Sequence, residues 1–455
     1  MCDNRKAVLF VTISASFLMP YMSSSINIAL PTIGEELNMS AVILSWAATS
    51  YLLSTVIVLL PLGRLSDILG RKKIFLYGII LYTLSSLFCA FSFSSLMLII
   101  FRVLQGIGSA MIYSTAVAIL ISLFPKEERG KIMGIYVAAV YIGLSMGPFL
   151  GGIFTQYLGW RSIFYLNVPI GILIIVLTIW KMKEYWIEER REKFDFAGSF
   201  IYGISIFLLI YGLSRLPEVL GFLFVGLGTA GLVIFGIFEY NTTSPILQLN
   251  VFRNNRVFIF SSLAALINYS ATFSVSFLLG LYLQYIKGFT PQTAGIIMIS
   301  QPVIQAFLSP YAGRLSDRVE PSGLSSLGMI VTVVALILFI FLDNATSLLY
   351  IIVTLAILGI GLALFSSPNT NAIMSSVDKK YYGIASGLLA TMRVMGQNMS
   401  LGITMVVFAV IIGNVEITPQ YYPEFLISSK LIFSILSVLC TAGIFFSLAR
   451  GKIRK

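Results

Sequence analysis

The chain has 455 residues, of which 58% are hydrophobic and only 11% are charged, and its mean hydropathy is +0.93. Such values exclude a soluble fold of this length and indicate a protein that lives in a lipid bilayer. The net charge of +11 is explained below by membrane topology and anionic lipid headgroups, so it is no argument for binding to nucleic acid.

Apolar runs separated by charged or Gly/Pro-bearing breaks predict fourteen membrane helices, because a hydrocarbon core about 30 Å thick needs about 20 apolar residues per helix. In chain order they span 7–31, 41–62, 74–93, 95–124, 132–155, 162–182, 196–214, 217–238, 257–286, 291–312, 323–342, 345–374, 384–412 and 430–449. The seventh and eighth are the least distinct, since only "LSRLPEV" separates them. A single re-entrant hairpin is the alternative for that pair.

Lysine and arginine follow the same map. If the N-terminus is cytoplasmic, the translocated loops hold only Arg161, Arg215, Lys287 and Lys430 of the 30 basic residues, while cytoplasmic loops hold most of the others. The sequence therefore predicts a multi-pass protein of the plasma membrane with both termini in the cytoplasm.

The first apolar run could also be a signal peptide, since two basic residues precede it. It is too long for one and carries polar Ser23–Ser25 and Asn27 within it, so we expect a retained first helix. The three cysteines are too scattered for a disulfide framework or a metal site, and we assign them no function.

The pentapeptide "GRLSD" occurs twice, at 63–67 and at 313–317, each time where a predicted helix leaves the membrane. The copies are eight helices apart, which fits two six-helix halves with two inserted helices between them. We therefore predict an N-terminal six-helix bundle (1–182), a two-helix insertion with flanking loops (183–250) and a C-terminal six-helix bundle (251–455). Duplicated bundles are typical of secondary transporters.

Six motifs resemble those of the major facilitator superfamily, in the right order and on the right helices. They are "GRLSDILGRKK" (63–73), "RVLQGIGSA" (102–110), "GLSMGPFLGG" (143–152), "NIALPTI" (27–33), "WRSIFYLNVPIG" (160–171) and "SPNTNAIMSSV…GIASGLLATMRVMGQ" (367–397). The last three narrow the resemblance to the fourteen-helix branch of drug:proton antiporters. The resemblance implies an all-α membrane fold of two six-helix bundles plus two inserted helices, alternating-access transport, and no cofactor.

The 63–73 loop is interpreted as a charged latch at the cytoplasmic side. Its glycines would let backbones approach, and Asp67 would sit against a helix N-terminus or pair with a nearby arginine. The predicted latch consists of Gly63, Arg64, Asp67, Gly70, Arg71 and Asp317. A positive-inside anchor is the alternative, although it does not explain an aspartate at the same place in both copies.

The fifth helix carries closely spaced small residues and a proline: Gly143, Gly147, Pro148, Gly151 and Gly152. Ordinary close packing between helices explains this spacing. The resemblance implies in addition that this face bends, packs against the opposite half and seals one side of the cavity.

Two arginines lie inside predicted helices, Arg102 in the outer half of the fourth and Arg393 nearer the cytoplasmic end of the thirteenth. A charge in the bilayer costs about 3 kcal/mol or more unless it faces a cavity or a partner. With the amides at membrane depth they give the predicted substrate cavity: Asn27, Arg102, Gln105, Asn268, Gln301, Asn369, Asn371, Arg393 and Gln397.

Acidic residues are missing from the predicted membrane interior. The chain has no histidine, and its 19 Asp and Glu all fall in loops or at helix ends. The related antiporters often carry an acid in the first helix, where this chain has Met22. If protons are moved, the carriers must be acids at the cytoplasmic end, such as Asp67, or the substrate itself.

Three functions compete. Proton-coupled efflux of drug-like or amphipathic small molecules is favoured by the resemblance and by the fifth helix. Transport of a neutral or anionic metabolite or lipid is favoured by two intramembrane arginines without an intramembrane acid. A membrane enzyme lacks a metal site, a general base and an activated nucleophile. The expected partners are a small-molecule substrate, the bilayer and protons, and we expect a monomer.

Overall fold

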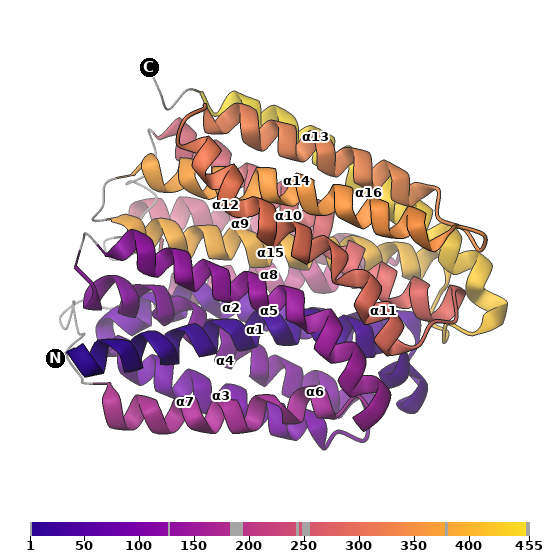
Figure 1. Cartoon of the computed structure of the whole chain (residues 1–455), viewed down its shortest axis with the longest axis horizontal. Coiled ribbons are helices and arrows are strands. Elements are labelled where there is room, and N and C mark those ends of the chain that lie inside the picture. The colour runs from indigo at the N-terminus through magenta and orange to yellow at the C-terminus, as the bar shows by residue number, and fades with distance from the viewer. Residues whose placement is uncertain are drawn as a thin grey trace.

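The computed structural model describes residues 2–125, 128–182, 194–242, 245–247, 255–377 and 381–451. Over these residues the chain forms long, roughly parallel or antiparallel helices and no strands (Figure 1). This confirms the predicted all-α membrane fold.

The helices before the insertion are α1 (Cys2–Glu36), α2 (Ala41–Leu69), α3 (Arg71–Ala90), α4 (Ser95–Leu123), α5 (Arg129–Leu158), α6 (Ser162–Tyr165) and α7 (Asn167–Lys181). The inserted pair is α8 (Phe196–Ser214) and α9 (Val219–Asn241). The helices after it are α10 (Arg256–Leu281), the π-helix η2 (Tyr282–Ile286), α11 (Pro291–Met298), α12 (Ser300–Ser316), α13 (Pro321–Ile340), α14 (Leu348–Ser375), α15 (Tyr382–Ile411), the 3₁₀ turn η4 (Pro419–Tyr421) and α16 (Tyr422–Ala449). We call α1–α7 the N-terminal bundle and α10–α16 the C-terminal bundle.

Within the described residues, 13 helical segments are long and apolar enough to cross a membrane. They match the predicted helices except the tenth, which is divided into α11 and α12. Both α8 and α9 are among the 13, which favours two separate spans over one re-entrant hairpin at 196–238.

Two of the predicted helices are interrupted, and a proline explains each break. A helical N–H bonds to the carbonyl four residues earlier, and proline has no N–H to donate. Pro169 leaves the carbonyl of Tyr165 unbonded, and α6 ends at Tyr165. Pro302 does the same to Met298, where α11 ends.

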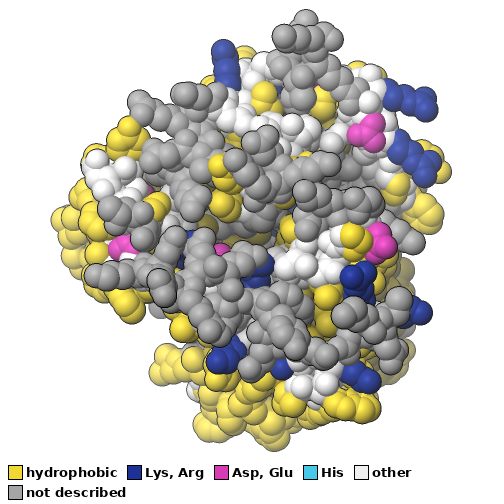
Figure 2. All heavy atoms as spheres, turned by 90° about the vertical axis from the view of Figure 1, so that its left-hand side faces the viewer, with side chains coloured by type: hydrophobic (Ala, Val, Ile, Leu, Met, Phe, Trp, Pro, Cys, Tyr) yellow, Lys and Arg dark blue, Asp and Glu magenta, His cyan; other side chains and the backbone are white. Residues whose placement is uncertain are grey.

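Both chain ends lie at the same end of the helix bundle, at the left of Figure 1. We call this end the terminal face and the opposite end the far face. Figure 2 shows the terminal face, where Lys and Arg outnumber Asp and Glu among the coloured charged side chains. That charge distribution agrees with the predicted positive side of the membrane.

The α8–α9 hairpin lies against both bundles. It packs on α2 of the N-terminal bundle, where Tyr202 Oη donates a hydrogen bond to the Val56 carbonyl at 3.0 Å. It also packs on α15 of the C-terminal bundle, where Leu213 covers Gly402. The predicted boundaries at 182/183 and 250/251 lie at or within segments outside the described residues and stay a prediction.

The helix α2 is longer than predicted, and this corrects the interpretation of the first "GRLSD". Residues 63–69 continue the helix to Leu69, so the predicted loop at 63–73 is wrong. Only Gly70 separates α2 from α3, with φ +103°, a conformation that favours glycine. Gly70 therefore turns the chain between the two helices.

Close contacts join the two bundles at the far face. The Gln284 amide donates to the Ile28 carbonyl at 2.9 Å, and the Ala41 N–H donates to the Val415 carbonyl at 2.9 Å. The hydroxyl of Ser40 donates to Asn414 Oδ1 at 2.5 Å. These bonds link α1 and α2 with the C-terminal bundle at its far end.

The glycines of α5 face two different partners. A Cβ at Gly143 would lie 2.5 Å from the Phe17 carbonyl oxygen, and one at Gly151 would lie 2.7 Å from Ser25 Cβ, both on α1 of the same bundle. Gly147 likewise packs on Ser24. The expectation that this whole face meets the opposite half is therefore wrong for these three glycines.

Only the far-face end of this stretch reaches the opposite bundle. A Cβ at Gly152 would collide with the Pro291 carbonyl oxygen, and one at Gly295 would collide with the Pro148 carbonyl oxygen. The absence of side chains at Gly152 and Gly295 thus lets the backbones of α5 and α11 touch.

We expect Gly151→Ala to lower the thermal unfolding temperature of the purified protein in detergent, because overpacking of a close helix contact costs about 1–3 kcal/mol. The matched control is Gly236→Ala on α9, where no atom lies within 4 Å of the added Cβ. The control should leave the unfolding temperature unchanged or raise it slightly. Equal unfolding temperatures for both variants would contradict the close approach of α5 to α1.

Candidate functional site

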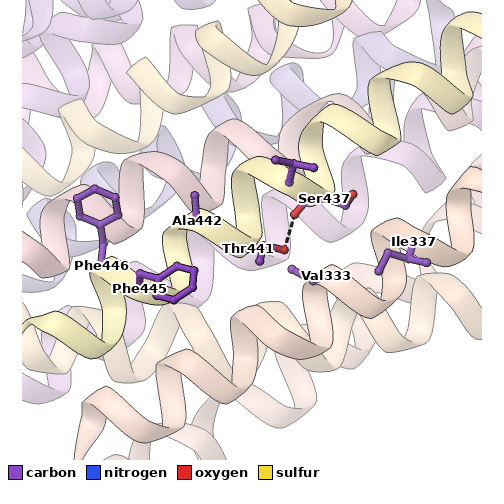
Figure 3. A pocket seen from close by; sticks show the side chains of 8 residues that line it. Val333, Ile337, Ser437, Thr441, Ala442, Phe445 and Phe446 are labelled. Carbon is purple, nitrogen blue, oxygen red and sulfur yellow. Dashed lines mark hydrogen bonds between the residues drawn. The ribbon is translucent and has the colours of Figure 1, made fainter.

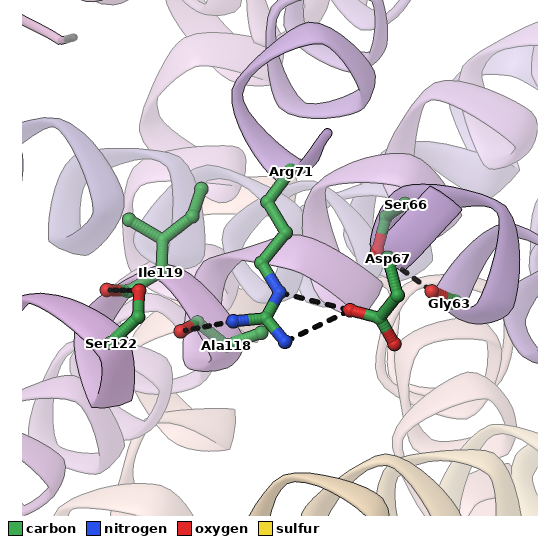
Figure 4. Close-up of polar contacts among 7 residues, drawn as sticks. All are labelled: Gly63, Ser66, Asp67, Arg71, Ala118, Ile119 and Ser122. Atoms are coloured by element: carbon green, nitrogen blue, oxygen red, sulfur yellow. Dashed lines mark hydrogen bonds and ion pairs between the residues drawn. The ribbon is translucent and has the colours of Figure 1, made fainter. Parts of the chain in front are cut away.

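The first predicted latch is an ion pair that also reaches a third helix (Figure 4). Asp67 lies in the last turn of α2 and Arg71 is the first residue of α3. Asp67 Oδ1 accepts from Arg71 Nη2 at 2.9 Å and from Nε at 3.0 Å, and Arg71 Nη1 donates to the Ala118 carbonyl of α4 at 3.4 Å. Arg71 is buried, so the pair connects α2, α3 and α4 at the terminal face.

The second copy uses a neutral partner. Asp317 follows the end of α12, and its Oδ1 accepts a hydrogen bond from Asn371 Nδ2 of α14 at 3.0 Å. The same amide donates to Ser316 Oγ at 2.9 Å. Asn371, predicted to line the substrate cavity, instead binds the second "GRLSD" to α14.

Both copies therefore tie equivalent helices together, α2 to α4 and α12 to α14, by different chemistry. Gly63 contributes little to this contact: a Cβ there would lie 3.9 Å from Ser114 Cβ, an ordinary distance, so the predicted close backbone approach is wrong. The Gly63 carbonyl does accept from Ser66 Oγ at 2.7 Å. Arg64 lies on α2 one turn before Asp67.

Arg102 lies inside the N-terminal bundle and is only 1% exposed. Its Nη1 donates to Gln105 Oε1 at 2.6 Å and its Nε to the Ala47 carbonyl at 3.2 Å, while its guanidinium lies 4.4 Å from the ring centre of Tyr51. Gln105 in turn donates to Ser86 Oγ at 2.7 Å. The protein itself thus supplies partners for Arg102 from α2 and α4, and Gln105 carries the connection to α3.

Asn369 belongs to a second enclosed arginine, Arg450, which is 0% exposed. Arg450 Nη1 donates to Asn369 Oδ1 at 3.1 Å and to Ser261 Oγ at 3.2 Å, and its Nε donates to the Ser447 carbonyl at 2.7 Å. The last predicted helix ends at residue 449, so the sequence predicts that Arg450 lies just beyond the membrane in the cytoplasmic C-terminus. A basic residue at the end of an apolar run is usually an anchor, so no sequence signal marks it as buried.

Four further predicted cavity residues differ in their surroundings. Asn27 and Asn268 are buried, and neither amide has a hydrogen-bond partner in the structure. Gln301 donates to Gln305 Oε1 at 2.8 Å on α12. Gln397 is half-buried on α15, four residues after Arg393.

Met22 stands where the related antiporters often carry an acid. It is fully buried, and its sulfur accepts a hydrogen bond from Asn167 Nδ2 of α7 at 3.2 Å. The position therefore serves a contact within the N-terminal bundle.

Arg393 lies between the two bundles and differs from the other two membrane-depth arginines. It is half-buried, its Cζ is 5.2 Å from the ring centre of Tyr269 on α10, and its Nε has no hydrogen-bond partner. Its strongest electrostatic neighbours are tyrosines of both bundles, and we call the set the tyrosine–arginine cluster: Tyr113, Tyr136, Tyr141, Tyr269 and Arg393. Sequence reasoning missed these tyrosines, because nothing in the sequence separates them from the other 18 of 22.

An apolar groove of about 590 Å³ lies between α13 and α16 (Figure 3). Its walls include Val438 and Phe445, which are 70% and 69% exposed on the outside of the bundle. Its polar side chains are Ser437 and Thr441 of α16, and the Thr441 hydroxyl donates to the Ser437 carbonyl at 2.8 Å. Apolar side chains on the outer surface of a membrane helix face lipid, so this groove is not part of the polar site.

Two helical bundles of related sequence motif, closed on each other at one face and enclosing polar residues at membrane depth, define a membrane transporter. The chain belongs to the Major Facilitator Superfamily, whose family model matches residues 12–401.

Several curated relatives are transporters. The chain is 28% identical over 445 residues to the riboflavin transporter RibZ of Clostridioides difficile (strain 630), covering 97% of this chain and 96% of RibZ. It is 28% identical over 404 residues to the tetracenomycin C resistance and export protein of Streptomyces glaucescens, covering 86% and 74% of the two chains. It is 28% identical over 384 residues to the multidrug resistance protein Stp of Mycobacterium tuberculosis (strain ATCC 25618 / H37Rv), covering 83% and 71%.

The fold is similar to that of a bacterial homologue of the human lysosomal transporter Spinster, solved in an inward-facing and unoccupied conformation. The TM-score is 0.67 at 18% sequence identity, and the match covers 98% of this chain and 97% of the other. This likeness concerns the fold.

We expect Asp67→Asn to leave the protein inserted and folded but to lower its transport rate about tenfold. The substitution removes the charge that holds buried Arg71, and a hydrogen bond to a charged group contributes about 1.5–3 kcal/mol. The matched control is Asp317→Asn, whose neutral partner Asn371 can bond equally well to an amide, so its loss should be twofold or less. Transport is measured at equal expression in membrane vesicles. Equal rates for Asp67→Asn and the parent would remove the latch and leave only the positive-inside anchor.

Proposed function

We propose that the protein is a secondary active transporter that exports amphipathic small molecules by alternating access. The main support for this proposal is the arrangement of the contacts. The two bundles touch each other at the far face, whereas at the terminal face the two aspartate contacts, Asp67–Arg71 and Asp317–Asn371, each lie within one bundle. The family supports it, because the chain and its curated relatives belong to a superfamily of transporters.

In this proposal the two faces close in turn. The far face is held by backbone contacts between α5 and α11 and by the bond between Ser40 and Asn414. At the terminal face, Asp67 binds within the N-terminal bundle and Asp317 within the C-terminal bundle. A state closed at the far face would receive its substrate from the terminal face, and the positive charge of that face supports a cytoplasmic location for it.

Proton coupling needs a carrier, and the described acids lie at helix ends. Asp67 has an ion-pair partner that a protonated carboxyl would lose, so its titration would weaken the latch. We propose that any coupled proton binds at such terminal-face acids or travels on the substrate, and not on an acid in the middle of the membrane.

The substrate class has two candidates. Export of drug-like compounds is supported by the tetracenomycin and multidrug relatives. Transport of a flat metabolite such as riboflavin is supported by RibZ, which matches nearly the whole of both chains. Catalysis is not part of the proposal, because the described residues contain no group of three metal-ligating side chains and the chain has no histidine.

We expect purified protein in proteoliposomes to transport riboflavin or a drug-like compound when an imposed pH gradient supplies the driving force. The measurement compares a panel of neutral, anionic and cationic compounds, with the gradient collapsed by an ionophore as the control. Transport that the ionophore abolishes supports coupling to protons. If no compound moves in either direction, with or without the gradient, the proposed function is wrong.

The proposed orientation has a separate test. In a background without native cysteines, Leu216→Cys between α8 and α9 should react with an impermeant maleimide from outside intact cells. Trp186→Cys, in the 183–193 segment outside the described residues, should react only after the membrane is opened. The reverse labelling pattern would overturn the placement of both termini in the cytoplasm.

A further inference from the structure

Arg102 and Arg393 lie at membrane depth, and Arg450 is enclosed close to the end of α16. The protein supplies hydrogen-bond acceptors to Arg102 and Arg450 but not to Arg393. Arg102 donates to Gln105 and to a backbone carbonyl, and Arg450 donates to serine and asparagine oxygens. No hydrogen bond or ion pair from Arg393 to any described residue is present, and its Nε is buried without an acceptor. A guanidinium without a protein acceptor must bond to water or to a ligand.

The position of Arg393 is that of a binding residue. It lies eleven residues after Tyr382, so roughly 17 Å along α15 from the terminal face. Tyr113 and Tyr141 belong to α4 and α5, whereas Tyr269 belongs to α10, so the tyrosines that neighbour Arg393 come from both bundles, and the guanidinium lies over the ring of Tyr269. The side chains in this group are partly exposed and therefore reach solvent-accessible space, rather than lying in a closed core: Arg393, Tyr113, Tyr141 and Tyr269.

Amides line the same region on the C-terminal side. On α12, Gln301 donates to Gln305 Oε1 at 2.8 Å, and Gln305 is a neighbour of Tyr141. Gln397 follows Arg393 by four residues and therefore shares its face of α15. The region thus offers one fixed positive charge, aromatic faces and neutral hydrogen-bonding groups.

Resting on the proposed function, we propose that the tyrosine–arginine cluster is the substrate site and selects flat aromatic compounds that present a carboxylate or a pair of carbonyl oxygens. A guanidinium bonds to two oxygens of such a group at once, and its plane continues the stack of an aromatic ligand against the tyrosine rings. A permanent cation of the same shape is repelled by Arg393, because no described carboxylate lies within ion-pair distance to neutralise it.

Two xanthene dyes test this selection, since fluorescein is anionic and rhodamine 123 is cationic on nearly the same ring system. Binding is measured by fluorescence anisotropy with the whole protein in nanodiscs of zwitterionic lipid, and empty nanodiscs are subtracted. We expect the parent protein to bind fluorescein at least tenfold more tightly than rhodamine 123. Equal affinities, a preference for rhodamine 123, or binding of neither dye would overturn the inference, whatever the variants do.

The variants separate charge from shape. Arg393→Gln should weaken fluorescein binding at least tenfold and change rhodamine 123 binding by twofold or less, and Arg393→Lys should fall between Arg393→Gln and the parent. Tyr269→Leu should weaken both dyes, because it removes a ring and no charge. Lys430→Gln, which removes an exposed charge near the far face, is the matched control and should change neither affinity. Unchanged fluorescein binding by Arg393→Gln overturns the inference.

The outcome is separable from that of the proposed function. If proteoliposomes transport some compound and Arg393→Gln transports it at the parent rate with parent dye affinities, the protein is a transporter whose substrate binds elsewhere. If no compound is transported although fluorescein binds as expected, the site stands and the export function fails.

Discussion

Hydrocarbon offers no partner to a polar group, so a donor at membrane depth needs an acceptor from the protein, from water or from a ligand. The arginines show how far this requirement organises the fold. Arg102 gathers α2 and α4 around itself and, through Gln105, also α3. Arg450 ties the end of α16 to α10 and α14. Arg71 reaches from the start of α3 to α4. Each bundle is thus held in part by a guanidinium that takes neutral acceptors from its own helix and from neighbouring helices, in addition to the packing of apolar faces.

The helices themselves could be predicted from sequence, because the thickness of a bilayer fixes the length of an apolar run. Their ends could not. Arg64, Ser66 and Asp67 break the apolar run as a loop would, yet they continue α2, since a helix that leaves the bilayer loses its apolar pattern before it loses its hydrogen bonds. The division of the tenth helix was readable in principle, because Pro302 cannot bond to Met298. Pro61 and Pro148 interrupt nothing, which shows that proline alone does not decide.

The sequence could show which polar residues lie at membrane depth, but not which residues they bind. Polar residues at membrane depth were identified from their position in apolar runs, but Asn369 and Asn371 bind residues 81 and 54 positions away, and such pairings leave no local pattern. The two aspartates could be found from the sequence because the five residues around them recur. Their different partners, Arg71 for Asp67 and Asn371 for Asp317, could not, because both partners lie outside the repeated pentapeptide. The tyrosines around Arg393 come from three helices of two bundles and share no spacing at all.

The helix α2 has a mechanical consequence. Its 29 residues form a rod about 44 Å long, flanked at the far face by Ser40, which is bonded to Asn414 of the other bundle, and carrying Asp67 near its terminal end. Because a single residue, Gly70, joins it to α3, little slack separates the two helices. A rigid tilt about the middle of the rod that parts Ser40 from Asn414 displaces Asp67 in the opposite direction, and Pro61 lies inside the rod, at a type of residue where helices commonly kink. The helix therefore joins a contact at the far face to the ion pair at the terminal face within one continuous element.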